Sequence, residues 1–199
     1  DWSIFRAIPV VVITGTNGKT TTARLVARMA HEAGLVVGNS STDGIHINRQ
    51  STEVGDWTGP GAARAILRHP EVEVAVLEAA RGGILRRGLG VSGCSGALVT
   101  NISKDHLGEY GVTKLSEMAE AKGIVYRAVH DRGCRVVNMD DSLTAPFARR
   151  AGPPCILFTL GPLEGVIAEH VEDGGRAIFC ENQGICIADS DGLRPLVSF

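Results

Sequence analysis

The residues whose types and spacing best suit chemistry lie between Ile8 and Thr22. A short apolar run with β-strand character leads into a turn bracketed by Gly15 and Gly18. A helical pattern begins at the pair Lys19 and Thr20. Such a turn points backbone N–H groups and a helix N-terminus at one place, which suits a polyphosphate. A lysine there neutralises phosphate oxygens and a threonine hydroxyl reaches Mg²⁺, so the segment predicts a phosphate-binding loop rather than an ordinary glycine-rich turn.

Polar residues also follow three other apolar runs. Glu78 follows the run 74–77, the segment 101–106 follows the run 97–100, and the segment 138–141 follows Val136 and Val137. Ligands of parallel α/β sheets bind at the carboxyl ends of the strands. We therefore expect these three groups to converge with the phosphate loop at one edge of a sheet.

Each of three candidate residues has an ordinary interpretation beside a functional one. Glu78 is either a helix cap or surface ion pair, or a Mg²⁺ ligand, and the nearby phosphate loop favours the metal. His106 is either structural or positioned for a second cation, and the sequence pairs it with no nucleophile. Lys122 lies within a helical pattern, and that local pattern alone predicts a solvated helix face.

The elements that would position these groups alternate along the first 160 residues. The apolar runs lack strict alternation, as expected of strands buried on both faces of a parallel sheet. The pattern predicts an α/β fold of the P-loop type, with a mostly parallel sheet flanked by helices. We expect strands at 10–13, 35–38, 72–77, 96–100, 135–138 and 156–159, and helices at 20–33, 59–69, 113–130 and 142–150.

The tail from about residue 161 has a different pattern. Short apolar runs at 166–172, 176–180 and 184–188 are separated by Asp-Gly-Gly and Gln-Gly, which are hairpin signals. We expect a single domain over residues 1–199. It would comprise a parallel-sheet core at 1–160 and a C-terminal antiparallel β appendage at 161–199 that covers a sheet edge.

The composition is that of a globular protein, with 44% hydrophobic and 21% charged residues. A net charge of −2 offers no field that would attract nucleic acid or an anionic membrane. No apolar run is long enough to span a bilayer, and no signal peptide opens the sequence. The five cysteines form no close pair, which favours reduced thiols in a cytoplasmic protein.

Three motifs together resemble the central, ATP-binding domain of the Mur ligase superfamily. Thr14-Gly-Thr-Asn-Gly-Lys-Thr-Thr-Thr22 is similar to the ATP loop of that superfamily. Asn101-Ile-Ser-Lys-Asp-His-Leu107 resembles its Asn-x-x-x-Asp-His-Leu segment, and Val136-Val-Asn-Met-Asp-Asp141 resembles its Asn-x-Asp-Asp segment. The resemblance covers about residues 8–160, and the combination is far more specific than any one motif.

Two further stretches, 42–60 and 76–89, are most similar to the cyanophycin synthetase branch of the superfamily. Peptidoglycan ligases carry a glutamate followed by serines where this chain has Glu78-Ala-Ala-Arg81. By the same analogy, the loop from Trp57 to Pro60 lies near a peptide substrate, although Pro60 is equally typical of a helix start.

The resemblance implies a role for each candidate residue. It implies one Mg²⁺ on Thr20 and Glu78, and a second on His106 and on Lys122 after carbamylation of that lysine by CO₂. Lys19, His106 and Lys122 would then be catalytic, and Asn138 would contact adenine. The ATP phosphates would be held by Gly15, Thr16, Asn17, Gly18, Lys19, Thr20 and Thr21.

The activity implied is that of an ATP-dependent acid–amino-acid ligase with ATP and Mg²⁺ as cofactors. Such a ligase activates a carboxylate as an acyl phosphate for attack by an amine; in the cyanophycin type, arginine is joined to an aspartate side chain of a polymer. The partners would be an amino acid and a peptide or polymer, without nucleic acid or membrane, in a protein that could be a homo-oligomer.

Alternatives remain open at this stage. They are a peptidoglycan-precursor or folylpolyglutamate ligase, a P-loop phosphotransferase or nucleotide switch, and a P-loop module that binds nucleotide without ligating. A guanine-binding Asn-Lys-x-Asp motif is absent from the sequence, which counts against a GTP switch. Because the chain begins at Asp1 and ends where the C-terminal domain of the superfamily would begin, we expect a fragment that binds ATP without forming product.

Overall fold

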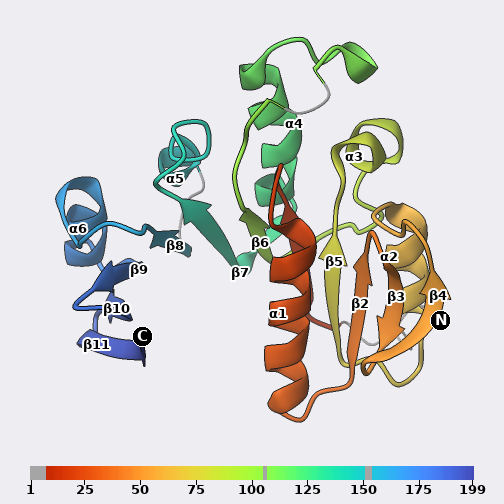
Figure 1. The fold of residues 1–199 in the computed structure, drawn as a ribbon, viewed down its shortest axis with the longest axis horizontal. Coiled ribbons are helices and arrows are strands. Elements are labelled where there is room, and N and C mark those ends of the chain that lie inside the picture. Colours follow the sequence, from red (N-terminus) through yellow and green to blue (C-terminus); the bar gives the residue numbers. More distant parts are fainter. Residues whose placement is uncertain (1–7, 105–106, 151–153) are drawn as a thin grey trace.

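The computed structural model describes residues 8–104, 107–150 and 154–199, and these form one 11-stranded sheet with helices on both faces (Figure 1). Along the sheet the strands lie in the order β11-β10-β9-β8-β7-β6-β1-β5-β2-β3-β4. The strands are β1 (Val10–Thr14), β2 (Val37–Ser41), β3 (Gly44–Ile47), β4 (Gln50–Val54), β5 (Val74–Glu78), β6 (Cys94–Val99), β7 (Val129–Asn138), β8 (Cys155–Phe158), β9 (Arg176–Glu181), β10 (Gly184–Asp189) and β11 (Gly192–Ser198). The helices are α1 (Lys19–Glu32), α2 (Pro60–Leu67), α3 (Arg81–Arg87), the short 3₁₀ helix η2 (Glu109–Gly111), α4 (Leu115–Arg127), α5 (Phe147–Arg150) and α6 (Gly165–Glu172).

The central strands are parallel and the edges are antiparallel. From β2 through β5, β1, β6, β7 and β8 to β9, each neighbouring pair is parallel. The hairpin β3–β4 adds antiparallel strands at one edge, and β10–β11 adds them at the other. The predicted fold class, a mostly parallel sheet flanked by helices with antiparallel strands at the C-terminus, is confirmed.

Alternate residues of the central strand β1 face different helices, which explains its uninterrupted apolar sequence. Ile13 packs with Ala23 of α1 on one face of the sheet. Val10 and Val12 belong to the larger cluster on the other face, with residues of α2 and α4. Because strands buried on both faces need no polar alternation, the apolar runs of the sequence are those of a covered parallel sheet.

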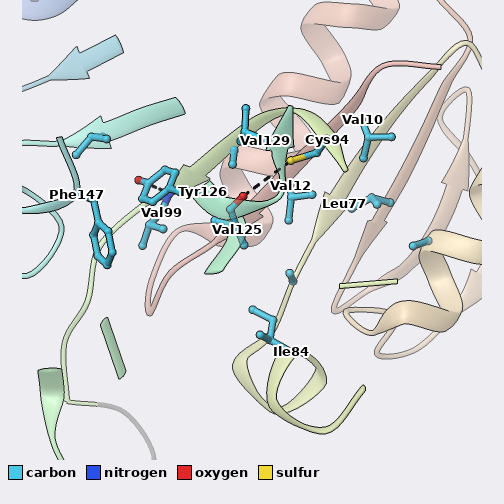
Figure 2. Packing of buried hydrophobic residues seen from close by; sticks show 14 of the residues in the cluster. Val10, Val12, Leu77, Ile84, Cys94, Val99, Val125, Tyr126, Val129 and Phe147 are labelled. Carbon is cyan, nitrogen blue, oxygen red and sulfur yellow. Dashed lines mark hydrogen bonds between the residues drawn. The ribbon is translucent and has the colours of Figure 1, made fainter. Parts of the chain in front are cut away.

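Polar atoms inside the larger cluster are satisfied locally (Figure 2). The Tyr126 hydroxyl donates to the Val136 carbonyl at 2.8 Å and accepts from the Val99 amide at 3.2 Å. Burial raises the pKa of the Cys94 and Cys155 thiols to about 11, so both are protonated at neutral pH. All five cysteines are free thiols, in agreement with the sequence prediction.

Several elements differ from those predicted. The run 166–172 was expected as a strand, but it forms helix α6, because Ile167 and Val171 are four residues apart and pack on the sheet. Strand β9 pairs parallel with β8, so the parallel sheet extends past residue 160. The division into a core at 1–160 and an appendage at 161–199 stays a prediction. Sequence reasoning also missed the hairpin β3–β4, helix α3 and strand β11.

No helix in the described ranges is long and apolar enough to cross a membrane. Predicted helix 142–150 shortens to α5, and the strand predicted at 35–38 begins two residues later, at Val37.

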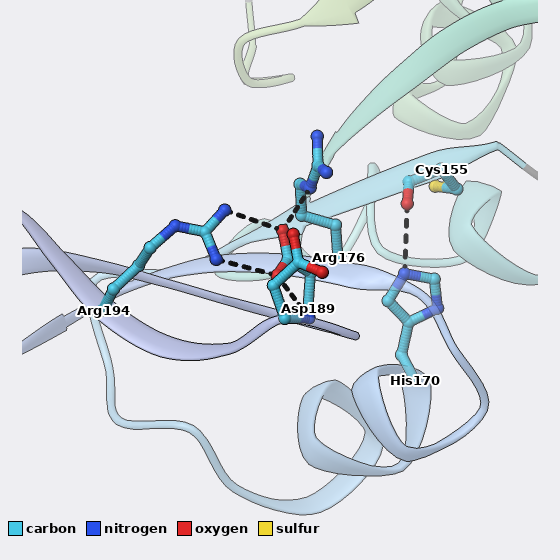
Figure 3. A network of polar contacts seen from close by, with 6 residues as sticks. Cys155, His170, Arg176, Asp189 and Arg194 are labelled. Carbon is cyan, nitrogen blue, oxygen red and sulfur yellow. Dashed lines mark hydrogen bonds and ion pairs between the residues drawn. The ribbon is translucent and has the colours of Figure 1, made fainter.

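Two arginines hold the carboxylate of Asp189 on the last hairpin (Figure 3). Arg194 of β11 donates to both carboxylate oxygens, at 2.9 and 3.1 Å, and Arg176 of β9 donates to one at 2.9 Å. Hydrogen bonds from Arg194 lower the pKa of Asp189 to about 2. This carboxylate therefore ties three neighbouring strands together.

We expect Asp189→Asn to destabilise the chain at neutral pH and to leave its stability less sensitive to acid. Because the pKa of this carboxyl is lower in the folded chain than in the unfolded chain, where it is near 4, the ionised carboxylate stabilises the fold fully at pH values above 4. That contribution is lost as the pH falls through the folded-state pKa of about 2. In urea unfolding, the difference between wild type and variant should shrink from pH 5 toward pH 2. Glu172→Gln, at an exposed position, is the control, and a constant difference across this range would contradict the expectation.

Candidate active site

The phosphate loop connects β1 to α1 through two glycines that no other residue could replace without strain. Gly15 has φ +146°, and a Cβ there would overlap the Thr100 hydroxyl. Gly18 has φ +80° and forms the N-cap of α1 without a side-chain cap. The first amides of α1 therefore keep their hydrogens for a ligand, and they lie at the positive end of the helix dipole.

The segment after β6 holds this loop in place. The Thr16 amide donates to the Asn101 carbonyl at 2.8 Å, and the Asn17 amide donates to the Asn101 side-chain oxygen at 3.0 Å. The Asn101 amide group returns a bond to the Asn17 carbonyl at 3.1 Å, and the Thr100 hydroxyl donates to the same carbonyl at 2.6 Å. The sequence analysis placed the segment 101–106 at this edge of the sheet but gave Asn101 no individual role.

Lys19 and Thr21 occupy the first turn of α1. The Lys19 ammonium donates to the Thr16 carbonyl at 2.8 Å, which folds its side chain over the loop. Thr21 is exposed. The loop thus presents a cation and several amides to one region, which is an arrangement that suits the oxygens of a polyphosphate.

Thr20 and Glu78 meet beside the loop, as their positions after β1 and at the end of β5 predicted. The Thr20 hydroxyl donates to Glu78 Oε2 at 2.8 Å and lies 3.2 Å from the Thr42 hydroxyl. Glu78 is 2% exposed, and its Oε1 has no hydrogen-bond partner among the described residues. A buried carboxylate oxygen without a partner, next to a hydroxyl, is the oxygen-rich donor set that Mg²⁺ prefers, so these residues fit a divalent cation.

Lys122 is buried, so the solvated-face interpretation of its helix is wrong. It is 3% exposed, and its ammonium donates to the Gly15 carbonyl at 2.5 Å. Gly123 explains the close approach of α4, because a Cβ at that position would collide with the Phe147 ring. The bond to Gly15 shows that α4 brings Lys122 to the base of the loop.

Asn138 and His106 are the other two residues that the sequence predicted for this site. The Asn138 side chain donates to the Thr100 carbonyl at 2.8 Å and accepts from the Asp140 amide at 2.9 Å, so it joins the ends of β6 and β7. His106 lies outside the described residues. Within the described part of the chain, no group of three or more His, Cys, Asp or Glu side chains is arranged to hold a metal.

A cleft of about 510 Å³ opens from the loop toward α3. Gly15, Lys19 and Lys122 line one end, and Arg86 and Arg87 line it as well. The other lining residues are Thr42, Asp56, Thr58, Gly59, Pro60, Ala80, Arg81, Gly82, Gly83, Glu109 and Tyr110. Because the loop from Asp56 to Pro60 lines this cleft, a substrate in contact with that loop would also reach the phosphate loop.

Comparison with known proteins indicates the same family that the sequence motifs resemble. A match to the Mur ligase middle domain family covers residues 13–173. A cyanophycin synthetase of Crocosphaera subtropica is 45% identical over 182 residues, which cover 92% of this chain and 21% of that protein. A UDP-N-acetylmuramoyl-L-alanyl-D-glutamate–2,6-diaminopimelate ligase of Geobacillus thermodenitrificans is 28% identical over 193 residues, covering 84% of the chain and 36% of that protein. The chain thus spans about a fifth of the length of the cyanophycin synthetase.

Solved structures share the fold. A 2,6-diaminopimelate ligase of the type just named superposes with a TM-score of 0.73 at 22% identity, covering 97% of this chain and 39% of that one. A bifunctional folylpolyglutamate synthase/dihydrofolate synthase with Mn, AMPPNP and L-glutamate bound superposes with a TM-score of 0.64 at 17% identity, covering 98% and 50%. At these identities the likeness shows the fold alone.

We expect Glu78→Gln to stabilise the metal-free chain and to abolish its response to Mg²⁺. Neutralising a buried, partly unpaired carboxylate should raise the free energy of unfolding by about 1 kcal/mol, while the cation loses its charged ligand. Thermal unfolding with EDTA and with excess Mg²⁺ measures both effects. Glu71→Gln, at an exposed position, should behave like wild type, and a Mg²⁺ response retained in Glu78→Gln would contradict the assignment.

Proposed function

This chain belongs to the Mur ligase middle domain family, and we propose that it is the ATP-binding part of a longer amide ligase. The ligase would activate a carboxylate by phosphoryl transfer and let an amino-acid amine displace the phosphate. The observation that carries the proposal is the contact of Thr20 with Glu78 beside a glycine loop, with one buried Glu78 oxygen left without a partner. Lys19 and Lys122 bring two cations to the same loop.

In this proposal the phosphate loop binds ATP. Lys19 leaves the Thr16 carbonyl for the phosphates and stabilises the negative charge of the transferred phosphoryl group. Asn138, which already orders the edge of the sheet near Thr100, uses the remaining hydrogen of its amide for adenine. The phosphates lie on the residues of the loop and the first helical turn, Gly15, Thr16, Asn17, Gly18, Lys19, Thr20 and Thr21.

Mg²⁺ would be held by Thr20 and Glu78, and it supplies charge neutralisation of the phosphate oxygens when bound. A second cation site would use His106 and the carbamate of Lys122. The neutral Lys122 amine attacks CO₂, a C–N bond forms and a proton leaves, so a cation becomes an oxygen ligand. Lys122 is 3% exposed and reaches the Gly15 carbonyl, so a carbamate formed on it would lie at the base of the loop.

For the substrates we propose the cyanophycin type, with arginine joined to an aspartate side chain. The chain is 45% identical to the cyanophycin synthetase from Crocosphaera subtropica and 28% identical to the diaminopimelate ligase. The higher identity supports cyanophycin-type substrates over those of the diaminopimelate ligase. A substrate panel distinguishes this reaction from a peptidoglycan-precursor or folylpolyglutamate ligase. A module that binds nucleotide without ligating would bind ATP but release no ADP with any pair of substrates.

We expect the chain to bind Mg-ATP and Lys19→Ala to weaken that binding at least about tenfold, because a charge on the phosphates is lost. Isothermal titration calorimetry on the 199-residue chain measures it. Arg28→Ala, on the exposed face of α1, is the matched control. Equal affinity of Lys19→Ala and wild type would overturn the phosphate-loop assignment, and GTP binding tighter than ATP would favour a nucleotide switch.

In the full-length ligase we expect Lys122→Ala to abolish ligation while ATP still binds, because the glycine loop is unchanged. Added bicarbonate or a short carboxylate should restore part of the activity, since it replaces the missing oxygen ligand. Lys122→Met, which keeps the length of the apolar stem, checks that loss of packing is not the cause. Normal ligation by Lys122→Ala, or full wild-type activity in CO₂-depleted buffer, would rule out the carbamate.

A further inference from the structure

A second cavity, of about 200 Å³, lies between helix α1 and the hairpin β3–β4. Five of its lining side chains are basic: Arg24, Arg28 and His31 of α1, His46 of β3, and Arg49 of the turn between β3 and β4. Among the described residues, no aspartate or glutamate lines it. The cavity shares no lining residue with the cleft beside the phosphate loop, so it is a separate site.

The cavity lies on the face of the sheet that α1 covers. His46 pairs with Asn39 of β2, and Asn39 pairs with Val76, which belongs to the apolar cluster beneath α1. Ala27 and Val37 are apolar lining residues, so a ligand has hydrocarbon to contact as well as cations. Pockets for drug-sized ligands have volumes of about 300–1,000 Å³. The smaller volume here therefore suits a small ligand.

The arginines of α1 are only weakly engaged. Arg24 forms an ion pair with Asp43, and Arg28 forms one with Glu32 at 2.7 Å. All four side chains are about half exposed, and water screens ion pairs at such positions. Both guanidinium groups can therefore exchange these partners for an anion that enters the cavity.

The turn of the hairpin holds Arg49 in a conformation that glycine prefers. Asn48 has φ +47° and Arg49 has φ +73°, as in a type I′ turn, whose second position favours glycine. The His31 ring donates from Nδ1 to the Asn48 side-chain oxygen at 2.8 Å, which anchors the turn to the last turn of α1. Among the described residues, neither His46 nor Arg49 has a side-chain hydrogen bond or ion pair. The dipole of α1 favours cations near its own C-terminus, but these two residues come from the hairpin.

We propose that this cavity binds a small phosphate monoester. Guanidinium groups pair with phosphate oxygens through two N–H donors at a time, and imidazole N–H groups add further donors. Three arginines without a lining carboxylate match a group of charge near −2 better than a single carboxylate ligand. The carbon part of the ester would lie against Ala27 and Val37. The site does not depend on the proposed function, because its residues take no part in the phosphate loop.

The test uses phenyl phosphate as the probe and the 199-residue chain carrying Lys19→Ala, so that the phosphate loop does not compete. Isothermal titration calorimetry in EDTA should show one binding site, and the NMR signals of the His31 and His46 rings should shift during the titration. Adding Arg49→Gly should weaken binding at least about tenfold, because the phosphate loses a bidentate cation. Gln183→Gly is the matched control, since Gln183 has φ +58° in the turn of the hairpin β9–β10, which lines no part of this cavity.

Urea unfolding separates lost binding from lost structure. Glycine adopts a positive φ without steric cost, so neither Arg49→Gly nor Gln183→Gly should lower the unfolding midpoint of the ligand-free chain. Loss of phenyl phosphate binding in Arg49→Gly alone, at an unchanged or higher midpoint, is the expected result. Absence of binding to the Lys19→Ala chain, equal affinity after Arg49→Gly is added, or NMR shifts confined to histidines outside the cavity would each overturn the proposal.

Discussion

The position of Gly15 is the constraint on which the rest of the site depends. Its missing Cβ lets Thr100 of the neighbouring strand end approach the loop, and its carbonyl receives the ammonium of Lys122 from α4. One residue thus sets the separation of the loop, the end of β6 and the helix that crosses the opposite face of the sheet. A side chain at this position would overlap Thr100, so the close packing of the loop on the end of β6 depends on this glycine.

The parts of the site that sequence predicted are those encoded by local pattern. The strand, glycine turn, Lys-Thr pair and helix of residues 10–32 lie within one continuous segment, and Glu78 follows a buried strand whose carboxyl end must meet that of β1. The burial of Lys122 could not be read in the same way. Its helix shows an ordinary polar pattern, and the burial of Lys122 follows from tertiary packing: Gly123 lets α4 lie close to the Phe147 ring, and Lys122 itself bonds to the Gly15 carbonyl.

The errors in the fold have similar causes. The segment of α6 is short and contains several β-branched residues, so its sequence was compatible with either a strand or a helix. The helix places Ile167 and Val171 on one side, where both pack against the sheet. Helix α3 carries two glycines near its start, which argue against a helix in isolation. Gly83 packs against Thr58, where an added Cβ would lie 3.3 Å from the carbonyl oxygen, and such a tertiary contact leaves no periodic signal in the sequence.

Charge is distributed unevenly around the candidate site. Beside the glycine loop, the buried Glu78 carboxylate has an oxygen without a partner among the described residues, and a bound cation would relieve that unfavourable burial. In the neighbouring cleft the basic lining side chains outnumber the acidic ones, and Arg86 lies over the Tyr110 ring. A ligand that carries phosphates and a cation would offset both imbalances. Leaving the Glu78 oxygen without a partner costs the unliganded chain stability, which is the trade-off expected of a site shaped for binding rather than for folding.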